Sequence, residues 1–178
     1  MDIKETLFTE IKEVDLGCGD HKAEGYFGID IGKYEGVDHV MDMRFHKLPF
    51  LDGQLDKVRA SHFNEHLTFD ENIYLFNEVY RVLKDGGIFE VIVPHATSYA
   101  QYSDLSHKSA WTEDTFGYFT PENIYHYSWF YEKDGERFPV INKWKVLKND
   151  NTPPYRYTAE GWVEVKLREI HAFLEKLP

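Results

Sequence analysis

The sequence predicts an α/β fold: a mixed seven-stranded sheet with a parallel core and antiparallel C-terminal strands. Two observations lead to this prediction. Short β-rich runs alternate with turns through residue 95, and one amphipathic helix separates the last two of these runs. With 178 residues the chain has the length of one domain, so we expect residues 1–178 to form a single unit.

The first half of the chain supplies the parallel core. Its five strand candidates are residues 12–16, 27–31, 37–41, 55–60 and 88–93. Between the last two, apolar residues recur at helical spacing over residues 71–84, where Asp70 can cap the start and Asp85-Gly86-Gly87 can stop the helix. A strand, a helix and a strand in this order predict a right-handed parallel crossover.

The second half of the chain predicts the antiparallel C-terminal strands of the sheet. Asp134-Gly135 lies between two aromatic runs and is typical of a hairpin turn. Residues 142–148 and 161–170 are two further strand candidates, which bring the total to seven. The tail, residues 170–177, fits either a short helix or the end of a strand.

The formal net charge of -11 limits the possible partners. An acidic surface repels a phosphate backbone, so we expect no nucleic acid and favour a small molecule or a protein. No apolar run approaches the ~20 residues of a membrane span, and the acidic start lacks the basic and apolar regions of a signal peptide. The single cysteine, Cys18, cannot form an internal disulfide. We therefore expect a cytoplasmic protein with no membrane partner.

A glycine turn follows the first strand candidate, in Asp15-Leu16-Gly17-Cys18-Gly19. Glycine permits positive φ and has no Cβ, so a ligand can press against the turn and meet its free N–H groups. Asp30 and Asp42 end the next two strands, and in a parallel sheet both would project over the same carboxyl edge. An acid at the end of the second strand suits a ribose diol. An ordinary turn is the alternative for the glycines alone.

Five motifs in order carry a resemblance to a known family. They are Asp15 to Gly19, Asp30, Leu48-Pro49-Phe50, Glu65-His66 and Arg81-Val82-Leu83-Lys84-Asp85-Gly86-Gly87. In this order they resemble class I S-adenosylmethionine (SAM)-dependent methyltransferases, in their small-domain, type 11-like branch. The resemblance covers residues 14–121 and implies a Rossmann-like sheet with SAM as the cofactor.

The resemblance also implies a set of cofactor contacts. Gly17, Cys18 and Gly19 would cradle the methionine part of SAM, and Asp30, with Ile31 beside it, would hold the ribose hydroxyls. Asp42 would meet the adenine amino group with Met43 next to the ring, and His62 and Phe63 would face the sulfonium and the adenosine. Asp15 would order the turn or reach the methionine ammonium.

The chain departs from the family pattern in its first crossover. Only Asp20 to Tyr26 separate Gly19 from the second strand, whereas a parallel connection usually needs about a dozen residues. We therefore expect an abbreviated crossover without the usual helix and an open pocket, in which SAM binds weakly or with the help of a partner.

A rival motif overlaps the fourth one. His62, Glu65 and His66 spell H-x-x-E-H, which on a helix would bind zinc in a hydrolase. Because the motif follows a strand directly and no third ligand is evident downstream, we expect no metal. In the methyltransferase pattern Glu65 and His66 shape the substrate pocket, and a capped loop-to-helix junction is the alternative.

A second cluster follows the fifth strand, where relatives place substrate contacts. It comprises Tyr99, Tyr102, Asp104, His107, Lys108 and Trp111. His107 is the first candidate for a general base and His95 the second, because imidazole has a near-neutral pKa. The alternative is that both histidines only hydrogen-bond within the loop.

Three functions follow from these features. The first is a SAM-dependent methyltransferase acting on an unidentified small-molecule acceptor, and the second is a catalytically silent SAM- or nucleotide-binding subunit of a complex. A zinc hydrolase is a remote third. The aromatic run from Phe116 to Tyr131 fits a core, a substrate pocket or a homodimer surface.

Overall fold

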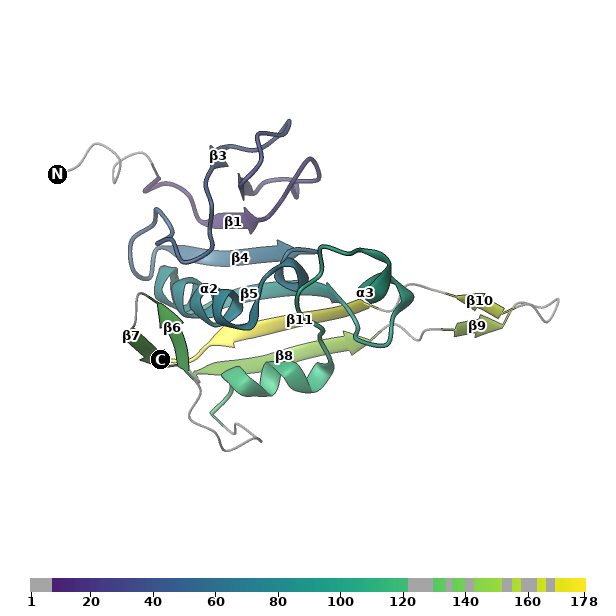
Figure 1. Cartoon of the computed structure of the whole chain (residues 1–178). Coiled ribbons are helices and arrows are strands. Elements are labelled where there is room, and N and C mark those ends of the chain that lie inside the picture. Colours follow the sequence, from purple (N-terminus) through teal and green to yellow (C-terminus); the bar gives the residue numbers. More distant parts are fainter. Residues whose placement is uncertain are drawn as a thin grey trace.

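The computed structural model describes residues 8–121, 130–133, 136–139, 143–151, 155–157, 163–165 and 169–178. Seven strands form one sheet in the order β3-β2-β1-β4-β5-β11-β8 (Figure 1). They are β1 Glu13–Leu16, β2 Phe27–Asp30, β3 His39–Val40, β4 Leu55–Ser61, β5 Leu83–Pro94, β8 Trp144–Asn151 and β11 Glu169–Lys176.

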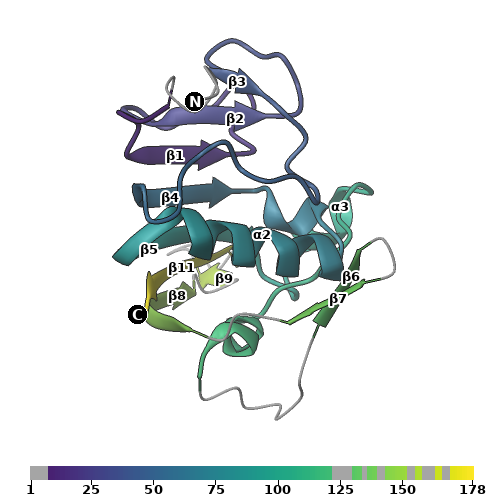
Figure 2. The same ribbon diagram turned by 90° about the vertical axis from the view of Figure 1, so that its left-hand side faces the viewer.

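The pairing confirms the mixed sheet. β3, β2, β1, β4 and β5 pair in parallel, and Figure 2 shows the first four of them one below another. β11 pairs antiparallel with both β5 and β8. Because the five parallel strands share one direction, their carboxyl ends meet at one edge of the sheet, as predicted.

The helix α2, Phe69–Val82, starts two residues earlier than predicted. Thr68, not Asp70, is its N-cap: the Thr68 hydroxyl accepts the Glu71 N–H at 3.3 Å, and the Glu71 carboxylate accepts the Thr68 N–H at 2.7 Å. This capping box satisfies two otherwise unpaired donors. The predicted stop at Asp85-Gly86-Gly87 is wrong, because the chain enters β5 directly at Leu83.

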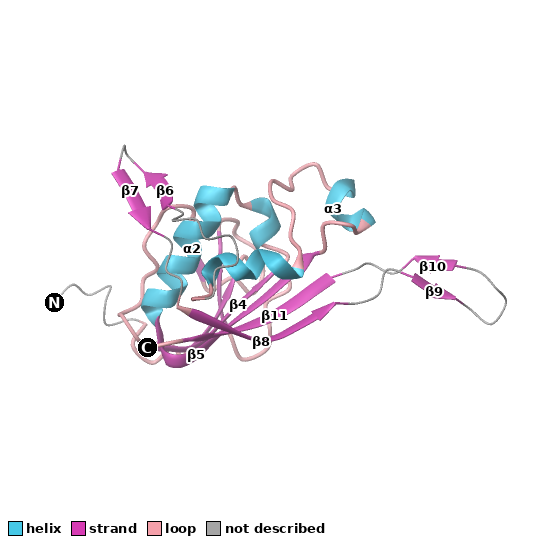
Figure 3. Cartoon of the chain, turned by 90° about the horizontal axis from the view of Figure 1, so that it is seen from below, coloured by secondary structure: helices cyan, strands magenta, loops and turns pink. Residues whose placement is uncertain are grey.

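The core lies between the sheet and α2. Figure 3 shows the helices on one face of the sheet, and Phe76 of α2 packs there against Phe89 of β5 and Trp144 of β8. The opposite face carries ion pairs, with Glu90 bonded to Lys57 at 2.6 Å and to His171 at 2.8 Å.

The connection from β1 to β2 contains turns and no helix, which confirms the abbreviated crossover. Side chains hold it in place. The Ala23 N–H donates to the Asp15 carboxylate at 2.8 Å, and the Asp38 carboxylate accepts both the Gly28 N–H and the Lys22 ammonium at 2.7 Å. No helix dipole therefore points at the glycine turn from this connection.

The C-terminal part confirms the hairpin and corrects one strand. β6, Phe130–Lys133, pairs antiparallel with β7, Glu136–Pro139, as expected for a hairpin, and the predicted turn residues Asp134-Gly135 lie outside the described residues. The predicted strand 161–170 is wrong in extent, because β10, Val163–Val165, pairs with β9, Tyr155–Tyr157, outside the main sheet. The tail is the strand β11.

The described part of the chain also contains three short helices: η1, Asn64–His66, α3, Tyr99–Ser103, and η2, Glu113–Phe119. Phe116 and Phe119 of the aromatic run are buried in the core, whereas Tyr125, Tyr127 and Trp129 lie outside the described residues. Among the helices that the structure describes, none has the length and apolarity required to cross a bilayer.

Arg81 joins two of the sequence motifs. Its guanidinium donates to the Leu48 carbonyl at 3.0 Å and to the Phe50 carbonyl at 2.9 Å, and it forms a two-bond fork with Glu78. The Glu78 carboxylate also accepts the Leu48 N–H at 3.0 Å. The turn around Leu48-Pro49-Phe50 is therefore fastened to the last turn of α2.

We expect Arg81→Ala to lower the free energy of unfolding by about 2 kcal/mol in urea titrations. The Phe50 carbonyl loses its charged donor, and the Leu48 carbonyl and the Glu78 carboxylate each keep only a backbone N–H donor. Lys84→Ala is the matched control: its ion pair with Asp56 is exposed on both sides and contributes about 0–1 kcal/mol. If the two variants lost equal free energy of unfolding, the contact between Arg81 and the Leu48-Pro49-Phe50 turn would not stabilise the fold.

Candidate functional site

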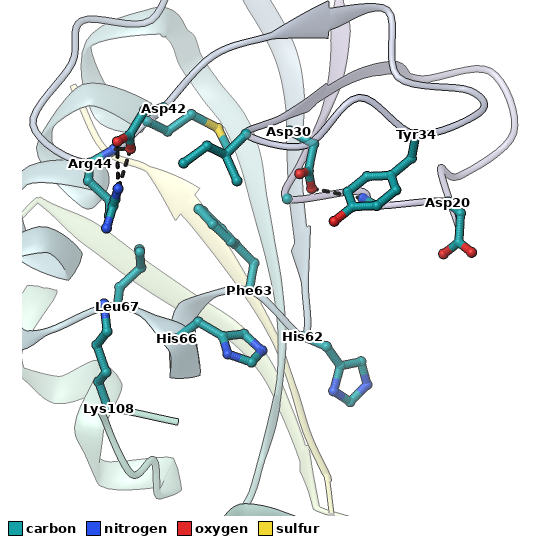
Figure 4. A pocket seen from close by; sticks show the side chains of 14 residues that line it. Asp20, Asp30, Tyr34, Asp42, Arg44, His62, Phe63, His66, Leu67 and Lys108 are labelled. Carbon is teal, nitrogen blue, oxygen red and sulfur yellow. Dashed lines mark hydrogen bonds and ion pairs between the residues drawn. The ribbon is translucent and has the colours of Figure 1, made fainter. Parts of the chain in front are cut away.

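An open cavity of about 610 Å³ lies at the carboxyl edge of the parallel strands (Figure 4). This volume falls within the roughly 300–1,000 Å³ typical of small-molecule sites. The residues that line the cavity are Gly17, Gly19, Asp20, Asp30, Ile31, Tyr34, Asp42, Met43, Arg44, His62, Phe63, His66, Leu67 and Lys108.

The glycine turn shapes the cavity through its missing side chains. Gly17 and Gly19 have φ of 65° and 51°, a region that favours glycine. A Cβ on Gly17 would overlap the Phe63 ring, whereas a Cβ on Gly19 would meet no protein atom within 4 Å. A ligand can therefore approach the backbone at Gly19.

The expectation of free N–H groups in this turn is wrong. The Gly17 and Cys18 N–H groups both donate to the Ile29 carbonyl, at 2.8 and 3.4 Å, and the Gly19 N–H donates to Asp30 at 2.9 Å. These bonds tie the turn to β2 and its end. The turn thus offers a ligand an open surface and not a set of N–H donors.

Asp30 ends β2 beside this turn and is 8% exposed. One of its carboxylate oxygens accepts the Gly19 N–H at 2.9 Å and the other accepts the Gly32 N–H at 2.7 Å. Each oxygen of an ionised carboxylate has about two acceptor positions, so both can accept a further hydrogen bond. Asp30 is therefore held in position and can still receive the two hydroxyl donors of a ribose.

Asp42 faces Arg44 at the other end of the cavity (Figure 4). The guanidinium forms a fork with the carboxylate, with N···O distances of 2.9 and 2.7 Å, and the Arg44 N–H adds a third bond at 2.9 Å. These hydrogen bonds lower the pKa of Asp42 to about 2. Asp42 is thus ionised at neutral pH, and Arg44 adds a cation to the cavity that the sequence analysis missed.

Apolar side chains lie between the two acids. Figure 4 shows the Phe63 ring projecting between Asp30 and Asp42, and Ile31, Met43 and Leu67 also line the cavity. A flat apolar surface flanked by two carboxylates fits the alternation of polar ribose and aromatic adenine in SAM. The open backbone at Gly19 adds room for the ligand, so these residues fit the cofactor that the resemblance implies.

Asp15 lies beneath the site and does not line the cavity. It is fully buried, its carboxylate accepts the Ala23 N–H at 2.8 Å, and Arg59 Nη1 lies 3.0 Å from the nearer of its two oxygens. Burial raises the pKa of Asp15, although the Ala23 N–H and Arg59 oppose this effect. Of the two roles considered for Asp15, ordering the turn matches this position.

Cys18 is also buried below the turn and is 7% exposed. Burial, followed by the charges of Asp15 and Asp30, raises the pKa of its thiol to about 11. At pH 8 only about one thiol in a thousand is then ionised, against about a quarter for a free cysteine of pKa ≈ 8.5.

We therefore expect iodoacetamide to alkylate Cys18 at pH 8 at least a hundredfold more slowly than free cysteine, since only the thiolate reacts. Mass spectrometry of timed samples gives the rate, and the same reaction in urea is the control for an accessible thiol. A native rate close to that of free cysteine would show that the thiol is exposed and ionised.

The cavity wall includes three residues that were predicted to face the SAM sulfonium or the substrate: His62, His66 and Lys108. His62 has a φ of 53°, and its Nδ1 lies 3.4 Å from the carboxylate of Glu65, which raises the pKa of the imidazole. Glu65 is fully buried behind the cavity wall. One side of the site therefore combines the basic side chains of His62, His66 and Lys108 with the carboxylate of Glu65.

Other predicted residues lie elsewhere. Tyr99 and Tyr102 are 75% and 72% exposed, and the structure does not bring them into the cavity wall. Trp111 is buried in the core, and its indole N–H donates to the Ser109 hydroxyl. His95 is 4% exposed, with its ring nitrogens bonded to Thr97 and Glu113.

His107 lies next to the cavity without lining it. Its ring meets the His66 ring edge to face, with 4.8 Å between centroids, and its Nδ1 lies 3.0 Å from the Gln101 carbonyl. The H-x-x-E-H interpretation lacks its helix, because Asn64–His66 forms a single 3-10 turn and His62 precedes it in a left-handed conformation. The structure therefore gives no support to a zinc hydrolase built on this motif.

Four cavity residues were missed by the sequence analysis: Asp20, Tyr34, Arg44 and Leu67. Arg44 follows Asp42 by two residues, and an opposite charge at that spacing was a signal that could have been used. Tyr34 and Asp20 lie in irregular loops, where no periodicity predicts the direction of a side chain.

Comparisons with known proteins agree with this geometry. Residues 14–91 match the family model for a methyltransferase domain. No curated protein matches the sequence.

Several solved structures with the same fold are SAM-dependent methyltransferases. One from Archaeoglobus fulgidus is 21% identical with a TM-score of 0.59, covering 95% of this chain and 88% of that one. One from Methanosarcina mazei is 17% identical with a TM-score of 0.53, covering 99% and 98%. A putative methyltransferase from Haloferax volcanii, solved with the Trm112 methyltransferase activator, is 14% identical with a TM-score of 0.57, covering 98% and 88%. Residues 14–91 thus match a methyltransferase domain, and the chain has the fold of SAM-dependent methyltransferases, a family whose cofactor is SAM.

Proposed function

We propose that the chain transfers the methyl group of SAM to a small-molecule acceptor bound beside His66 and Lys108. The position of Asp30 carries the proposal: the carboxylate ends β2 at the open glycine turn and has acceptor capacity for two hydroxyl groups. In this proposal Asp30 holds the ribose, Phe63 and Met43 contact the adenine, and Asp42 accepts from its amino group.

The protein has few chemical tasks in this reaction. Bound SAM supplies an activated methyl group, so the cavity has to align the acceptor with it and exclude competing nucleophiles. The proposed general base is His107. Its Nδ1–H donates to the Gln101 carbonyl, which leaves the lone pair on Nε2 to take a proton from an acceptor hydroxyl.

The net charge favours a small acceptor. At -11 the protein repels polyanions, so we propose no nucleic-acid substrate. The cavity is open at the surface and not enclosed, which lets an acceptor enter from the side of His66 and Lys108.

A catalytically silent SAM-binding subunit is the second candidate. The connection between β1 and β2 has no helix to cover the cavity, and a protein of the same fold from Haloferax volcanii was solved with an activator protein. Such a subunit would bind SAM without turnover.

The two candidates differ in product formation. We expect S-adenosylhomocysteine to form from SAM only when a suitable member of a panel of hydroxyl, amine and carboxylate acceptors is added, as followed by chromatography. Formation should stop in Asp30→Ala. SAM binding without any product across the panel would instead support the subunit.

A further inference from the structure

We propose that Glu65, His66 and His107 form a binding site for a divalent transition-metal ion at the edge of the cavity. One ligand atom from each of the three side chains lies within 4.8 Å of the others. The set differs from the H-x-x-E-H interpretation, because His107 takes the place of His62. The sequence offered no third ligand near Glu65 and His66, and the fold supplies it from a loop about 40 residues downstream.

Glu65 gives the strongest reason to expect a cation. Its side chain is fully buried, and neither carboxylate oxygen receives a hydrogen bond in the described part of the structure. The nearest basic group described is His62, whose Nδ1 lies 3.4 Å from Oε1 and whose ring is half exposed. A buried carboxylate without hydrogen bonds is costly, and buried charges are usually paired or bound to a metal.

The hydrogen bonds of both histidines leave a lone pair on the second ring nitrogen, which in His107 lies 3.9 Å from the Asp104 carboxylate. The Gln101 carbonyl can only accept, so His107 Nδ1 carries the proton at 3.0 Å and Nε2 carries the lone pair. The Ser106 hydroxyl donates its one hydrogen to Asp104 at 2.6 Å, so it accepts from His66 Nδ1 at 3.0 Å. In each ring the hydrogen bond fixes the tautomer that a metal ligand needs.

The backbone holds the two segments together. The Glu65 carbonyl accepts the Lys108 N–H at 2.7 Å and the Ser109 N–H at 3.1 Å, next to His107. The Ser109 hydroxyl donates to the Asn64 carbonyl at 3.1 Å. These bonds hold His107 beside Glu65 and His66 through the folding of the loop itself, so a bound ion has only to draw the three side chains closer together.

The donor set indicates the class of metal. Two imidazoles and one carboxylate favour Zn²⁺, Fe²⁺, Co²⁺ or Mn²⁺ over Mg²⁺ and Ca²⁺, which prefer oxygen ligands. His66 also lines the cavity, so the proposed metal site adjoins the proposed acceptor side. A bound metal would take the His107 lone pair, so the general-base role proposed above applies only to the metal-free protein.

The test uses the full chain after treatment with a chelator, in the absence of SAM. Zn²⁺ is titrated by calorimetry, and Co²⁺ is followed by its visible absorption, which depends on coordination. We expect one ion per chain, an affinity at least tenfold lower in His66→Ala and in His107→Ala, and a rise in Tm on adding Zn²⁺ that Glu65→Gln abolishes.

His21→Ala is the matched control. His21 Nε2 lies 3.4 Å from the Asp20 carboxylate on the surface. This pair also offers one imidazole and one carboxylate, but it is not part of the group formed by Glu65, His66 and His107. Binding should be unchanged in this variant. The proposal is overturned if the wild-type protein gives no cobalt bands, if zinc binding survives in both cluster variants, or if His21→Ala removes it. Because SAM is absent, none of these outcomes bears on cofactor binding.

Discussion

Replacing Asp30 by alanine should weaken SAM binding by about a hundredfold or more. The variant removes the proposed acceptor of two ribose hydroxyls, and a hydrogen bond to a charged group contributes about 1.5–3 kcal/mol. Two such bonds at the lower limit give about 3 kcal/mol, which corresponds to roughly 150-fold in Kd. Isothermal titration calorimetry measures the change, with circular dichroism to verify the fold.

Asp20→Ala is the matched control for Asp30→Ala. Asp20 also lines the cavity, but its side chain is 69% exposed and lies 3.4 Å from the surface residue His21. We expect its Kd to stay within twofold of wild type. If both variants lost affinity equally, the negative charge of the cavity and not the ribose contact would be responsible.

Gly17→Ala should lower the free energy of unfolding by about 3 kcal/mol. A left-handed alanine costs about 1–2 kcal/mol, and overpacking typically adds 1–3 kcal/mol because the new Cβ would overlap the Phe63 ring. Gly86→Ala is the control, since Gly86 has a φ of 74° and open space around its Cβ position. Urea titration should show a loss of about 1 kcal/mol for Gly86→Ala.

Gly19→Ala separates packing from binding. Gly19 has a φ of 51°, lines the cavity and has no protein atom within 4 Å of its Cβ position. Its stability should therefore resemble that of Gly86→Ala, while its SAM affinity falls at least tenfold, because the methyl group enters the space proposed for the cofactor. Wild-type affinity in Gly19→Ala would argue that the ligand does not approach the turn.

The sequence predicted the part of the site that depends on regular structure. Parallel strands bring their carboxyl ends to one edge, so Gly19, Asp30 and Asp42 could be placed together before any coordinates were known. The abbreviated crossover followed from counting the residues between Gly19 and the second strand. The hydrogen bonds between Arg81 and the Leu48-Pro49-Phe50 turn were not predicted, although each residue belongs to a motif that the sequence shows.

The irregular segment after β5 could not be predicted in the same way. Tyr99 and Trp111 both suggested substrate contacts, yet one is exposed and the other is buried, because loop side chains follow no period. The approach of His107 to Glu65 depends on two backbone hydrogen bonds to the Glu65 carbonyl. Such bonds join residues distant in sequence and carry no local pattern.

The most direct test of the central claim is a calorimetric titration of the wild-type protein with SAM and, separately, with S-adenosylhomocysteine. We predict one binding site per chain for each ligand, located at the cavity between Asp30 and Phe63 and therefore weakened about a hundredfold or more for both ligands in Asp30→Ala. No binding of either ligand to the folded wild-type protein would contradict the claim that this cavity is a SAM site.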